Sequence, residues 1–401
     1  MQDYLAREIT QWLSSPGREE QIAAARYLMG QHDVLGRQRQ VIGKGGSLEI
    51  SRNLPNNRLV DNQYGKLVRQ KVSYLLGNPF RFKGAEGKSV NAVEGFFNLR
   101  RRRVIRNACE DSLSGGIGWV MPVIDGEGRF NIKRIPPYEI LPFWADGEHT
   151  ILDCAVRVYE QDSVDYTMTG RRARKVELYT PGSIERYILD GGRLFPEGGG
   201  AWITAADKPW GWSKVPLVAF KAPDEQPLLN RVKSLQDALN TMLSDFQNNL
   251  QEDARNTILV LKNYDGADLA EFRHNLAAYG AVRVKTIDGT QGGVETLRVN
   301  VDHESYKAMA AMLKQAIIQN GMGFDITDGA MRGTPNRMTL LAMYADIELD
   351  ADGYESEWKA SFEELLSFVG TGLSLGLGAE LTLGDAEVFF DRYTLDEIEG
   401  R

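Results

Sequence analysis

Cysteine is nearly absent from this 401-residue chain. Its two cysteines, Cys109 and Cys154, are far apart and form no CxxC pair, which excludes a disulfide scaffold and a cysteine zinc site and suits a reducing compartment. The histidines are isolated as well, and none belongs to an HExxH motif. They are His32, His149, His274 and His303. We therefore expect no metal site and no cofactor.

Long apolar runs and an excess of basic charge are also lacking. The N-terminus "MQDYLAREITQWLSS" has no apolar signal core, and no run of about eighteen apolar residues occurs anywhere. Asp and Glu number 55 against 47 Lys and Arg, so a broad basic DNA-binding face is not expected. These absences predict a soluble protein, made inside the cell, without a membrane partner.

One stretch imitates a phosphate-binding loop. "KGAEGKSV" ends in Gly87-Lys88-Ser89, as the pattern GxxxxGK[ST] requires. Phe82 stands where the pattern needs its first glycine, and we expect no strand-to-helix context around it. Without that glycine the backbone amides cannot wrap a phosphate, so a polar turn is predicted in place of a nucleotide site.

A second stretch, "ELDADGYESEWK", imitates a calcium loop. Glu348, Asp350, Asp352 and Gly353 match ligand positions and the turn glycine, but Lys359 replaces the closing glutamate. The stretch lies within a helical pattern, where these carboxylates point in different directions. We predict an acidic helix with a kink at Gly353.

Other candidate clusters have no catalytic partners. The acids Asp346 and Asp350 share a helix face without a nearby histidine or nucleophile, so a helix surface is predicted and no catalytic residue is assigned. Arginines 100–103, with Arg106, spread around a helix axis; DNA contact, subunit contact and a solvated face all remain open. Methionines gather around residues 321–337 and indicate adaptable packing more than a cofactor box. They are Met309, Met312, Met322, Met331, Met338 and Met343.

The first 226 residues read as a mixed α+β domain. Apolar spacings of three and four predict helices, including one amphipathic helix over residues 56–80 whose stripe begins at Leu59 and Val60. The predicted helices lie at residues 3–13, 18–29, 56–80 and 90–113, and Gly77, Asn78 and Pro79 are expected to stop the third. From residue 115 onward, alternating β-branched and aromatic residues broken by Gly and Pro predict antiparallel strands. Further strands are expected at residues 155–159, 176–180, 185–189 and 217–220.

The remainder is dominated by long helices. Residues 227–256 and 302–320 read as two helices on either side of a strand–helix–strand unit that is followed by a last strand near "VETLRV", all within residues 257–301. The stretch "GMGFDITDGAMRGTPNR" then supplies four glycines and almost no apolar side chain that could pack. Its glycines are expected to allow backbone conformations closed to other residues. A third long helix begins near Pro335, and the strand "AEVFFDRY" nearly ends the chain.

Three blocks resemble the portal (head–tail connector) proteins of tailed bacteriophages, in the siphovirus-type group. "NNRLVDNQYGKLVRQKVSYLLGNPF" resembles the early helix block of that family, written near N-x-x-V-D-x-x-x-G-Y-x-x-G-x-P. The block from "LQDALNTMLSDF" to "YGAVRV" resembles its stem helix and clip. The block from "AIIQNGMGF" to "EWKASFEELL" resembles its second stem helix, tunnel loop and long wing helix. Together they cover about residues 56–401, and their order is more specific than any one motif.

The resemblance implies a division of the chain. Residues 1–226 would form the wing, 227–256 the first stem helix, 257–301 the clip and 302–320 the second stem helix. Residues 321–335 would form the tunnel loop, and 336–401 a long kinked wing helix with a final strand. The family's crown, a helical bundle after that strand, is expected to be absent or truncated because the sequence stops at Arg401.

The resemblance also implies a function. Portal proteins form a ring, dodecameric in the virion, at one capsid vertex, and double-stranded DNA passes through it during packaging and ejection without sequence preference. The implied partners are further copies of the chain, the terminase large subunit, scaffold and major capsid protein, and a head–tail adaptor. The implied locations are the host cytoplasm during assembly and then the virion. The function implied is structural, so no enzyme activity is expected.

Site residues follow by position. The implied tunnel-loop residues are Gly323, Asp325, Asp328, Gly329, Arg332 and Gly333. Lys307 and Lys314 are candidate phosphate contacts on the second stem helix, although either can pair with a neighbouring subunit. The implied clip residues that meet terminase or adaptor are Asp268, Glu271, Phe272 and Arg273. A solvent-facing connector remains the alternative for the loop.

The charge balance fits a conduit. Residues 302–352 hold eight acids and four bases, a balance of 4 − 8 = −4. Six to ten phosphate contacts already give tight, salt-dependent binding, so a sliding channel should be acidic or neutral where it is narrowest. Three alternatives remain: a minor capsid or head-completion protein without a channel, a packaging motor ATPase and, last, a soluble enzyme.

Overall fold

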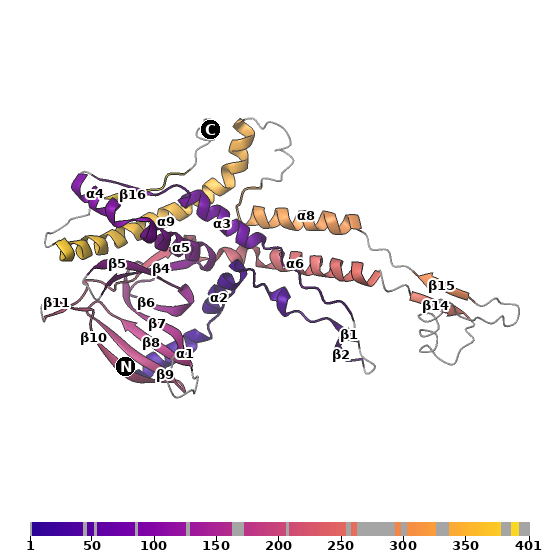
Figure 1. Cartoon of the computed structure of the whole chain (residues 1–401), viewed down its shortest axis with the longest axis horizontal. Helices are drawn as coiled ribbons and strands as arrows, with labels where there is room; N and C mark the ends of the chain where they lie inside the picture. The colour runs from indigo at the N-terminus through magenta and orange to yellow at the C-terminus, as the bar shows by residue number, and fades with distance from the viewer. Residues whose placement is uncertain are drawn as a thin grey trace. The chain divides into compact units, whose positions relative to one another are not determined.

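The computed structural model describes residues 2–42, 46–51, 54–84, 87–125, 129–162, 172–205, 208–253, 258–262, 293–297, 303–325, 337–377 and 386–392 (Figure 1). The chain divides into two compact units. Unit 1 comprises Met1–His32, Asn62–Gln236 and Gln315–Arg401, and unit 2 comprises Asp33–Asp61 and Asp237–Lys314. Two long helices, α6 (Leu228–Asp253) and α8 (His303–Asn320), each contribute residues to both units.

Unit 1 contains the predicted N-terminal helices, followed by a helix that begins later than predicted. Helix α1 spans Gln2–Leu13 and α2 spans Pro16–Leu28, where Ser15 caps the first turn by accepting the Arg18 amide. Helix α3 spans Gln63–Leu76, capped by Asn62, so the prediction that Leu59 and Val60 extend this helix is wrong.

The predicted single helix over residues 90–113 is in fact two helices. Helix α4 spans Gly87–Phe96 and α5 spans Leu99–Gly115. Asn98 interrupts them because its side chain accepts the amides of Arg100 and Arg101, which starts a new helix. Gly116 then ends α5 in the left-handed conformation, with φ 84°.

Two antiparallel sheets form the centre of unit 1. One has three strands in the order β13-β4-β5, and the other has five in the order β10-β9-β8-β7-β6. Their bounds are β4 Ile117–Ile124, β5 Phe130–Ile135, β6 Ile140–Trp144, β7 Leu152–Asp162, β8 Arg172–Tyr179, β9 Ser183–Asp190, β10 Arg193–Ala201 and β13 Val218–Lys221. Short 3-10 turns occur at Pro137–Glu139 and Pro223–Glu225, and β11 (Ile203–Ala205) pairs with β12 (Lys208–Trp210). The predicted antiparallel strands are thus confirmed, whereas β10 was not predicted because its "PEGGG" run is unusual in strands.

The five-stranded sheet is buried on both faces. Val156 and Val158 face one way and pack with Leu5 and Ile9 of α1. The alternate residue Ala155 faces the other way, into a cluster with Trp119 of the three-stranded sheet. This alternation follows the two-residue period of a strand.

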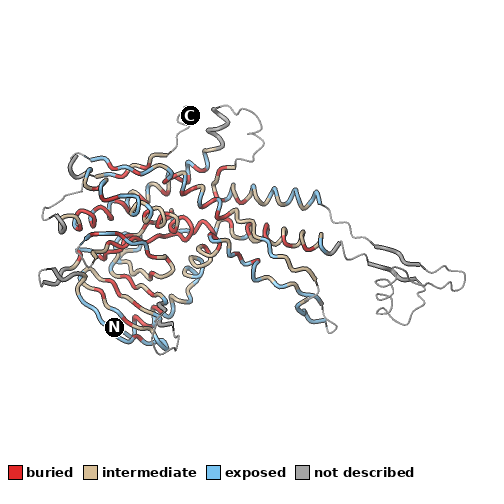
Figure 2. Tube along the Cα trace, viewed as in Figure 1, coloured by how far each residue is buried: buried red, intermediate tan, exposed pale blue. Residues whose placement is uncertain are grey.

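Helix α9 (Arg337–Leu377) is continuous over 41 residues and contacts α3 and the three-stranded sheet. It changes direction partway along its length (Figure 1). The strand predicted near the end of the chain is confirmed as β16 (Glu387–Phe389). It pairs with β3 (Arg81–Lys83). The aromatic rings of Phe80, Phe82 and Phe362 pack together between these elements. Buried residues are concentrated along α3, α5 and the neighbouring part of α9 (Figure 2).

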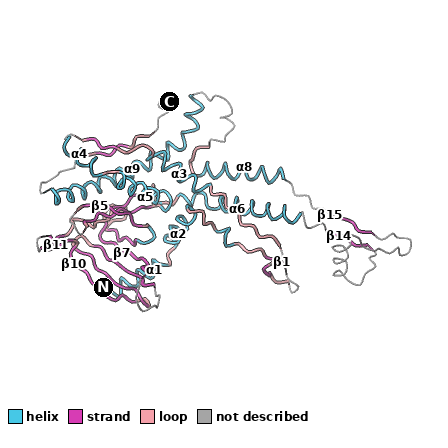
Figure 3. Tube along the Cα trace, viewed as in Figure 1, coloured by secondary structure: helices cyan, strands magenta, loops and turns pink. Residues whose placement is uncertain are grey.

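Unit 2 contains parts of the two long helices and two strand pairs (Figure 3). A 3-10 turn spans Asp33–Gly36, β1 (Gln40–Ile42) pairs with β2 (Leu48–Ile50), and β14 (Ile258–Lys262) pairs with β15 (Gly293–Leu297). The predicted strands at the start and end of residues 257–301 are therefore present. The helix and strand predicted between them lie outside the described residues. The assignment of wing, stem and clip remains a prediction.

An extended segment in unit 2 replaces the helical turn that was predicted before α3. The backbone amides of Asn57, Leu59 and Asp61 donate to Asn248 Oδ1, Ser244 Oγ and Asn240 Oδ1, at 2.7, 2.9 and 3.0 Å. The three acceptors are spaced by four residues on α6, about 6 Å, and the donors by two extended residues, about 6.7 Å. This match explains why the segment remains extended.

Candidate functional site

The glycine-rich stretch after α8 begins with a well-built segment, residues 321–325, which we call the loop root. The amides of Gly321, Met322 and Gly323 donate to the carbonyls of Ile317, Gln319 and Ile318, at 3.0, 3.0 and 2.8 Å. Met322 has φ 51°, so the helix ends in a left-handed cap with methionine where glycine is usual. A non-glycine residue there costs about 1 kcal/mol.

The two glycines of the loop root, Gly321 and Gly323, leave room for a neighbouring side chain and do not adopt the left-handed backbone conformation. Neither Gly321 nor Gly323 has positive φ. A Cβ on Gly321 would lie 2.1 Å from Leu67 Cδ2, and one on Gly323 would lie 2.3 Å from Leu67 Cδ1. The prediction that these glycines serve unusual conformations is wrong, because they allow the backbone to approach α3.

Side chains of α3 and α9 hold the loop root on two sides. Gln70 donates to the Phe324 carbonyl at 2.7 Å and accepts the Phe324 amide at 2.9 Å. The Phe324 ring stacks on Tyr344 of α9, with centroids 4.3 Å apart and planes 20° apart. The prediction that almost nothing in this stretch packs is therefore wrong for residues 321–325.

A buried charge cluster lies beside the loop root. Lys71 Nζ donates to the Met322 carbonyl at 2.8 Å and to Asp350 Oδ2 at 2.6 Å. Arg231 donates to Asp350 Oδ1 at 2.8 Å. Burial lowers the pKa of the Lys71 amine, and the Asp350 carboxylate opposes that shift.

The remaining tunnel-loop candidates lie outside the described residues. Of the predicted set, the structure describes Gly323 and Asp325, whereas Asp328, Gly329, Arg332 and Gly333 fall in a range that it leaves undescribed. The clip candidates Asp268, Glu271, Phe272 and Arg273 also fall outside the described residues. Their roles stay predictions.

The two lysine candidates of α8 differ in their surroundings. Lys307 is exposed. Lys314 Nζ lies 2.7 Å from Asp61 Oδ2, and its side chain is 43% exposed. Lys314 therefore already has an anionic partner within its own chain, while the phosphate role of both lysines remains a prediction.

Most of the arginine run is used to hold unit 1 together. Arg101 donates to the Phe96 carbonyl at 2.8 Å. Arg102 donates to the carbonyls of Phe97 and Phe80 and pairs with Glu94, at 2.7 Å from the carboxylate. Arg106 donates to Leu76 and Ser73. Only Arg100 and Arg103 of the five described arginines are exposed.

The acids of the calcium-like stretch lie on α9 and have basic partners. Glu348 and Asp352 each lie 2.8 Å from Arg392 Nη1, and Asp350 belongs to the Lys71 cluster. The helix predicted over this stretch is confirmed, because the stretch lies within the continuous helix α9. Among the described residues, no group of three or more His, Cys, Asp or Glu side chains is placed to hold a metal ion.

The phosphate-loop look-alike does lie between a strand and a helix, which corrects one expectation. Strand β3 ends at Lys83 and α4 begins at Gly87. However, Phe82 is buried with Phe97 and Phe362, so an aromatic side chain fills the place of the required glycine. β3 also pairs antiparallel with β16, unlike the parallel strand of a nucleotide-binding unit.

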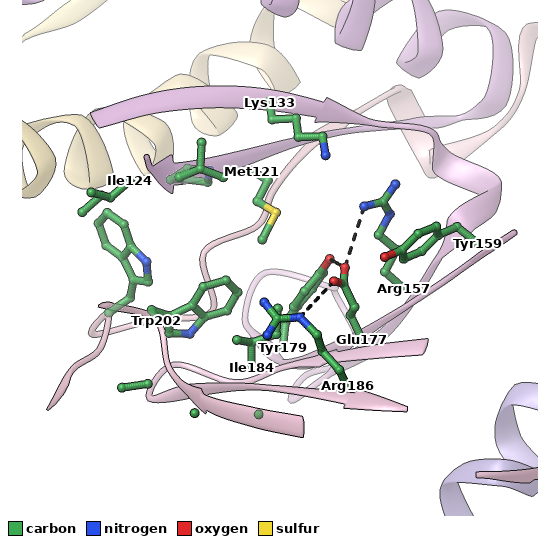
Figure 4. Close-up of a pocket in the computed structure, with 16 residues that line it drawn as sticks. Met121, Ile124, Lys133, Arg157, Tyr159, Glu177, Tyr179, Ile184, Arg186 and Trp202 are labelled. Carbon is green, nitrogen blue, oxygen red and sulfur yellow. Dashed lines mark hydrogen bonds and ion pairs between the residues drawn. The ribbon is translucent and has the colours of Figure 1, made fainter. Parts of the chain in front are cut away.

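A polar cavity of about 430 Å³ lies between the two sheets of unit 1 (Figure 4). Arg157 and Arg186 both approach the Glu177 carboxylate, at 3.8 and 3.5 Å, and Tyr179 donates to it at 2.7 Å. Arg157 also pairs with Glu139 at 2.8 Å. Two carboxylates thus lie close to the two arginines, and Lys133 is a third basic residue in the lining of the cavity.

Sequence reasoning missed Lys71, although a signal was present. Lys71 interrupts an apolar stripe of α3 between Val68 and Val72, and all three side chains are buried. A lysine on a buried helix face indicates a fixed anionic partner. The partner itself could not be inferred, because Asp350 is 279 residues away.

The described elements follow one another in the order that the sequence resemblance implies: two long helices on either side of a strand pair, then a glycine-containing root and a 41-residue helix. Residues 18–371 match the family described as "Phage portal protein, SPP1 Gp6-like". The chain belongs to this family.

Two named relatives cover most of the chain. The portal protein of Clostridium phage phiCD119 is 25% identical over 364 residues, which span 88% of this chain and 79% of that protein. The portal protein of Bacillus phage SPP1 is 24% identical over 375 residues, which span 88% of this chain and 71% of that protein.

Family membership confirms the coarser predictions from sequence. The chain is a phage portal protein, a structural component of the virion with a role in DNA packaging, and not an enzyme. The family also implies an oligomeric ring. Among the described residues, no helix is both long enough and apolar enough to cross a lipid bilayer.

Proposed function

We propose that copies of this chain form the dodecameric ring at the unique capsid vertex and that double-stranded DNA passes through it during packaging and ejection. The family match over residues 18–371 carries this proposal. The proposed parts are the wing at residues 1–226 and 336–401, the stem helices at 227–256 and 302–320, the clip at 257–301 and the tunnel loop at 321–335.

Exposed apolar side chains support contacts between copies. On α8, the large apolar side chains of Met309 and Met312 are 50% and 64% exposed. On the β1–β2 hairpin, Leu48 and Ile50 are 68% and 58% exposed. A two-stranded hairpin is marginally stable on its own, so burial against a neighbouring copy would stabilise it.

The proposed conduit must contact the duplex without holding it. The net charge of −8 per chain supports weak binding. In a twelve-membered ring, one exposed base per copy at the channel wall would already reach the six to ten phosphate contacts that give tight binding. We propose that the clip docks first the terminase large subunit and later the head–tail adaptor, and that scaffold and major capsid protein meet the wing.

Electron microscopy of the purified protein tests the ring. The proposal expects closed annuli with an opening wide enough for duplex DNA. A chain that stays monomeric at high concentration, and also when procapsids assemble around it, would contradict the proposal and favour a head-completion protein without a channel.

Deletion of residues 327–333 tests the loop. If this stretch contacts DNA in the channel, particles that carry the deletion should package less DNA or lose it after packaging. Unchanged packaging together with unchanged DNA retention would favour the alternative, a connector that faces solvent.

A further inference from the structure

Lys71 is a buried lysine that contacts two other segments at once. Its exposure is 2%, and its ammonium group lies 2.8 Å from the Met322 carbonyl and 2.6 Å from Asp350 Oδ2. The second oxygen of Asp350 accepts Arg231 Nη1 at 2.8 Å. One carboxylate on α9 therefore connects the loop root, through Lys71, with the beginning of α6.

The buried ammonium group of Lys71 requires acceptors at fixed positions. An ammonium group away from water needs oxygen acceptors, and here a backbone carbonyl and a carboxylate supply two of them. An apolar side chain at this position would suit the stripe of α3 better, since Val68 and Val72 beside it are fully buried. The lysine thus makes a contact that packing alone does not require.

The loop root reaches α9 by a second route. Phe324 stacks on Tyr344, while its backbone is held by both ends of the Gln70 amide. Met322 keeps its left-handed conformation between these contacts. A backbone conformation of this kind persists where its surroundings determine it.

We propose that Lys71 is a positioning residue for the loop that follows α8. It fixes the loop root to α9 and to the start of α6, so a force on the loop passes to these helices and is not absorbed at the root. The contact stands on the geometry alone, and its role in the virion rests on the proposed function of the loop.

Hydrogen exchange of the full-length protein, followed by mass spectrometry without DNA, tests the proposal. Lys71→Met should make the amides of residues 317–325 and of 344–354 exchange at least tenfold faster than in the wild type, while α5 stays unchanged. Lys71→Arg, which keeps a cation beside Asp350, should restore part of the protection.

Arg134→Met is the matched control, because Arg134 also binds a buried carboxylate of unit 1, that of Asp111. It should speed exchange in α5 and β5 and leave residues 317–325 as in the wild type. The proposal is overturned if Lys71→Met leaves residues 317–325 within twofold of the wild type, or if Arg134→Met accelerates them equally.

If Lys71→Met does not fold, an experiment on the wild-type protein tests the proposal instead. In native-state exchange at increasing urea, the amides of Gly323 and Phe324 should open together with those around Asp350. Independent opening at lower urea would overturn the proposal. Deletion of residues 327–333 leaves Lys71 untouched, so failure of the proposed function and failure of this inference give separate results.

Discussion

At the scale of single residues, position 323 requires glycine because the Leu67 side chain occupies the space that a larger residue would need. A methyl group at this position would lie 2.3 Å from Leu67 Cδ1 and 3.1 Å from Gln70 Oε1. We expect Gly323→Ala to lower the free energy of unfolding by about 1–3 kcal/mol, as overpacking usually does. Thermal unfolding of the purified protein measures this loss.

Gly95 supplies the control, because it lies in α4 and a methyl group added there would have no other atom within 4 Å. Gly95→Ala should keep or raise stability, by up to about 1 kcal/mol. Leu67→Ala creates room, so the pair Gly323→Ala with Leu67→Ala should be less destabilised than the sum of the two single losses. Additive losses would show that the two side chains do not meet.

Asp111 predicts a pH dependence of stability. Burial raises the pKa of its carboxyl group to about 6, although Arg134 contacts both oxygens and opposes this shift. The unfolded pKa is about 3.9, so the folded state binds the proton more tightly. The contribution of this group to stability is therefore complete below about pH 4 and is lost as the pH rises through about 6.

The Asp111→Asn variant should lose this pH dependence. A shift of about two pKa units corresponds to about 3 kcal/mol between pH 4 and pH 7. Unfolding midpoints at half-unit steps over that range give the profile, with the exposed Asp190→Asn as a control that should keep the wild-type slope. If Asp111→Asn shows the same slope as the wild type, other groups cause it.

At the scale of elements, three polar side chains of α6 hold an extended segment of unit 2. Asn248 accepts both the backbone amide and the side-chain amide of Asn57, at 2.7 and 2.9 Å, and is only 2% exposed. Asn248→Ala should destabilise this segment by about 1–3 kcal/mol, because its donors lose their acceptor. Hydrogen exchange at residues 57–61 should become faster.

Asn249 gives a matched control on the same helix. It has the same side chain, but its amide donates to the Tyr306 hydroxyl of α8 at 3.1 Å and not to the extended segment. Asn249→Ala should therefore leave exchange at residues 57–61 unchanged. If hydrogen exchange at residues 57–61 became equally faster in both variants, helix α6 as a whole would be destabilised. Asn248 would then have no specific role in holding the segment.

The elements that could be predicted are those with a strong local period. The spacings of three and four in α6 and the alternation in β4 carry their own signal, and both elements formed where expected. The start of α3 was predicted wrongly, because residues 57–61 are fixed by acceptors that lie nearly two hundred residues further along the chain. Strand β10 was missed since its pairing with β9, and not its glycine-rich composition, makes it a strand.

At the scale of the whole molecule, the order of segments carries more information than any motif. Three sequence blocks in a fixed order suggested the portal family, and the family match over residues 18–371 confirms it. The contacts of the loop root could not be predicted in the same way. Lys71, Gln70 and their partners are more than 250 residues apart in sequence, and no local pattern joins them.

The two lysines of α8 allow a test of how the proposed ring meets DNA. Lys307 is exposed, whereas Lys314 lies 2.7 Å from Asp61. In a ring, one substitution changes every copy, so each channel loses as many phosphate contacts as it has subunits.

We expect Lys307→Gln to make DNA loss from filled particles less dependent on salt between about 50 and 200 mM. Lys314→Gln should change this dependence little and should lower stability by less than about 1 kcal/mol, as for a surface ion pair. Equal salt profiles for both variants and the wild type would exclude Lys307 as a phosphate contact.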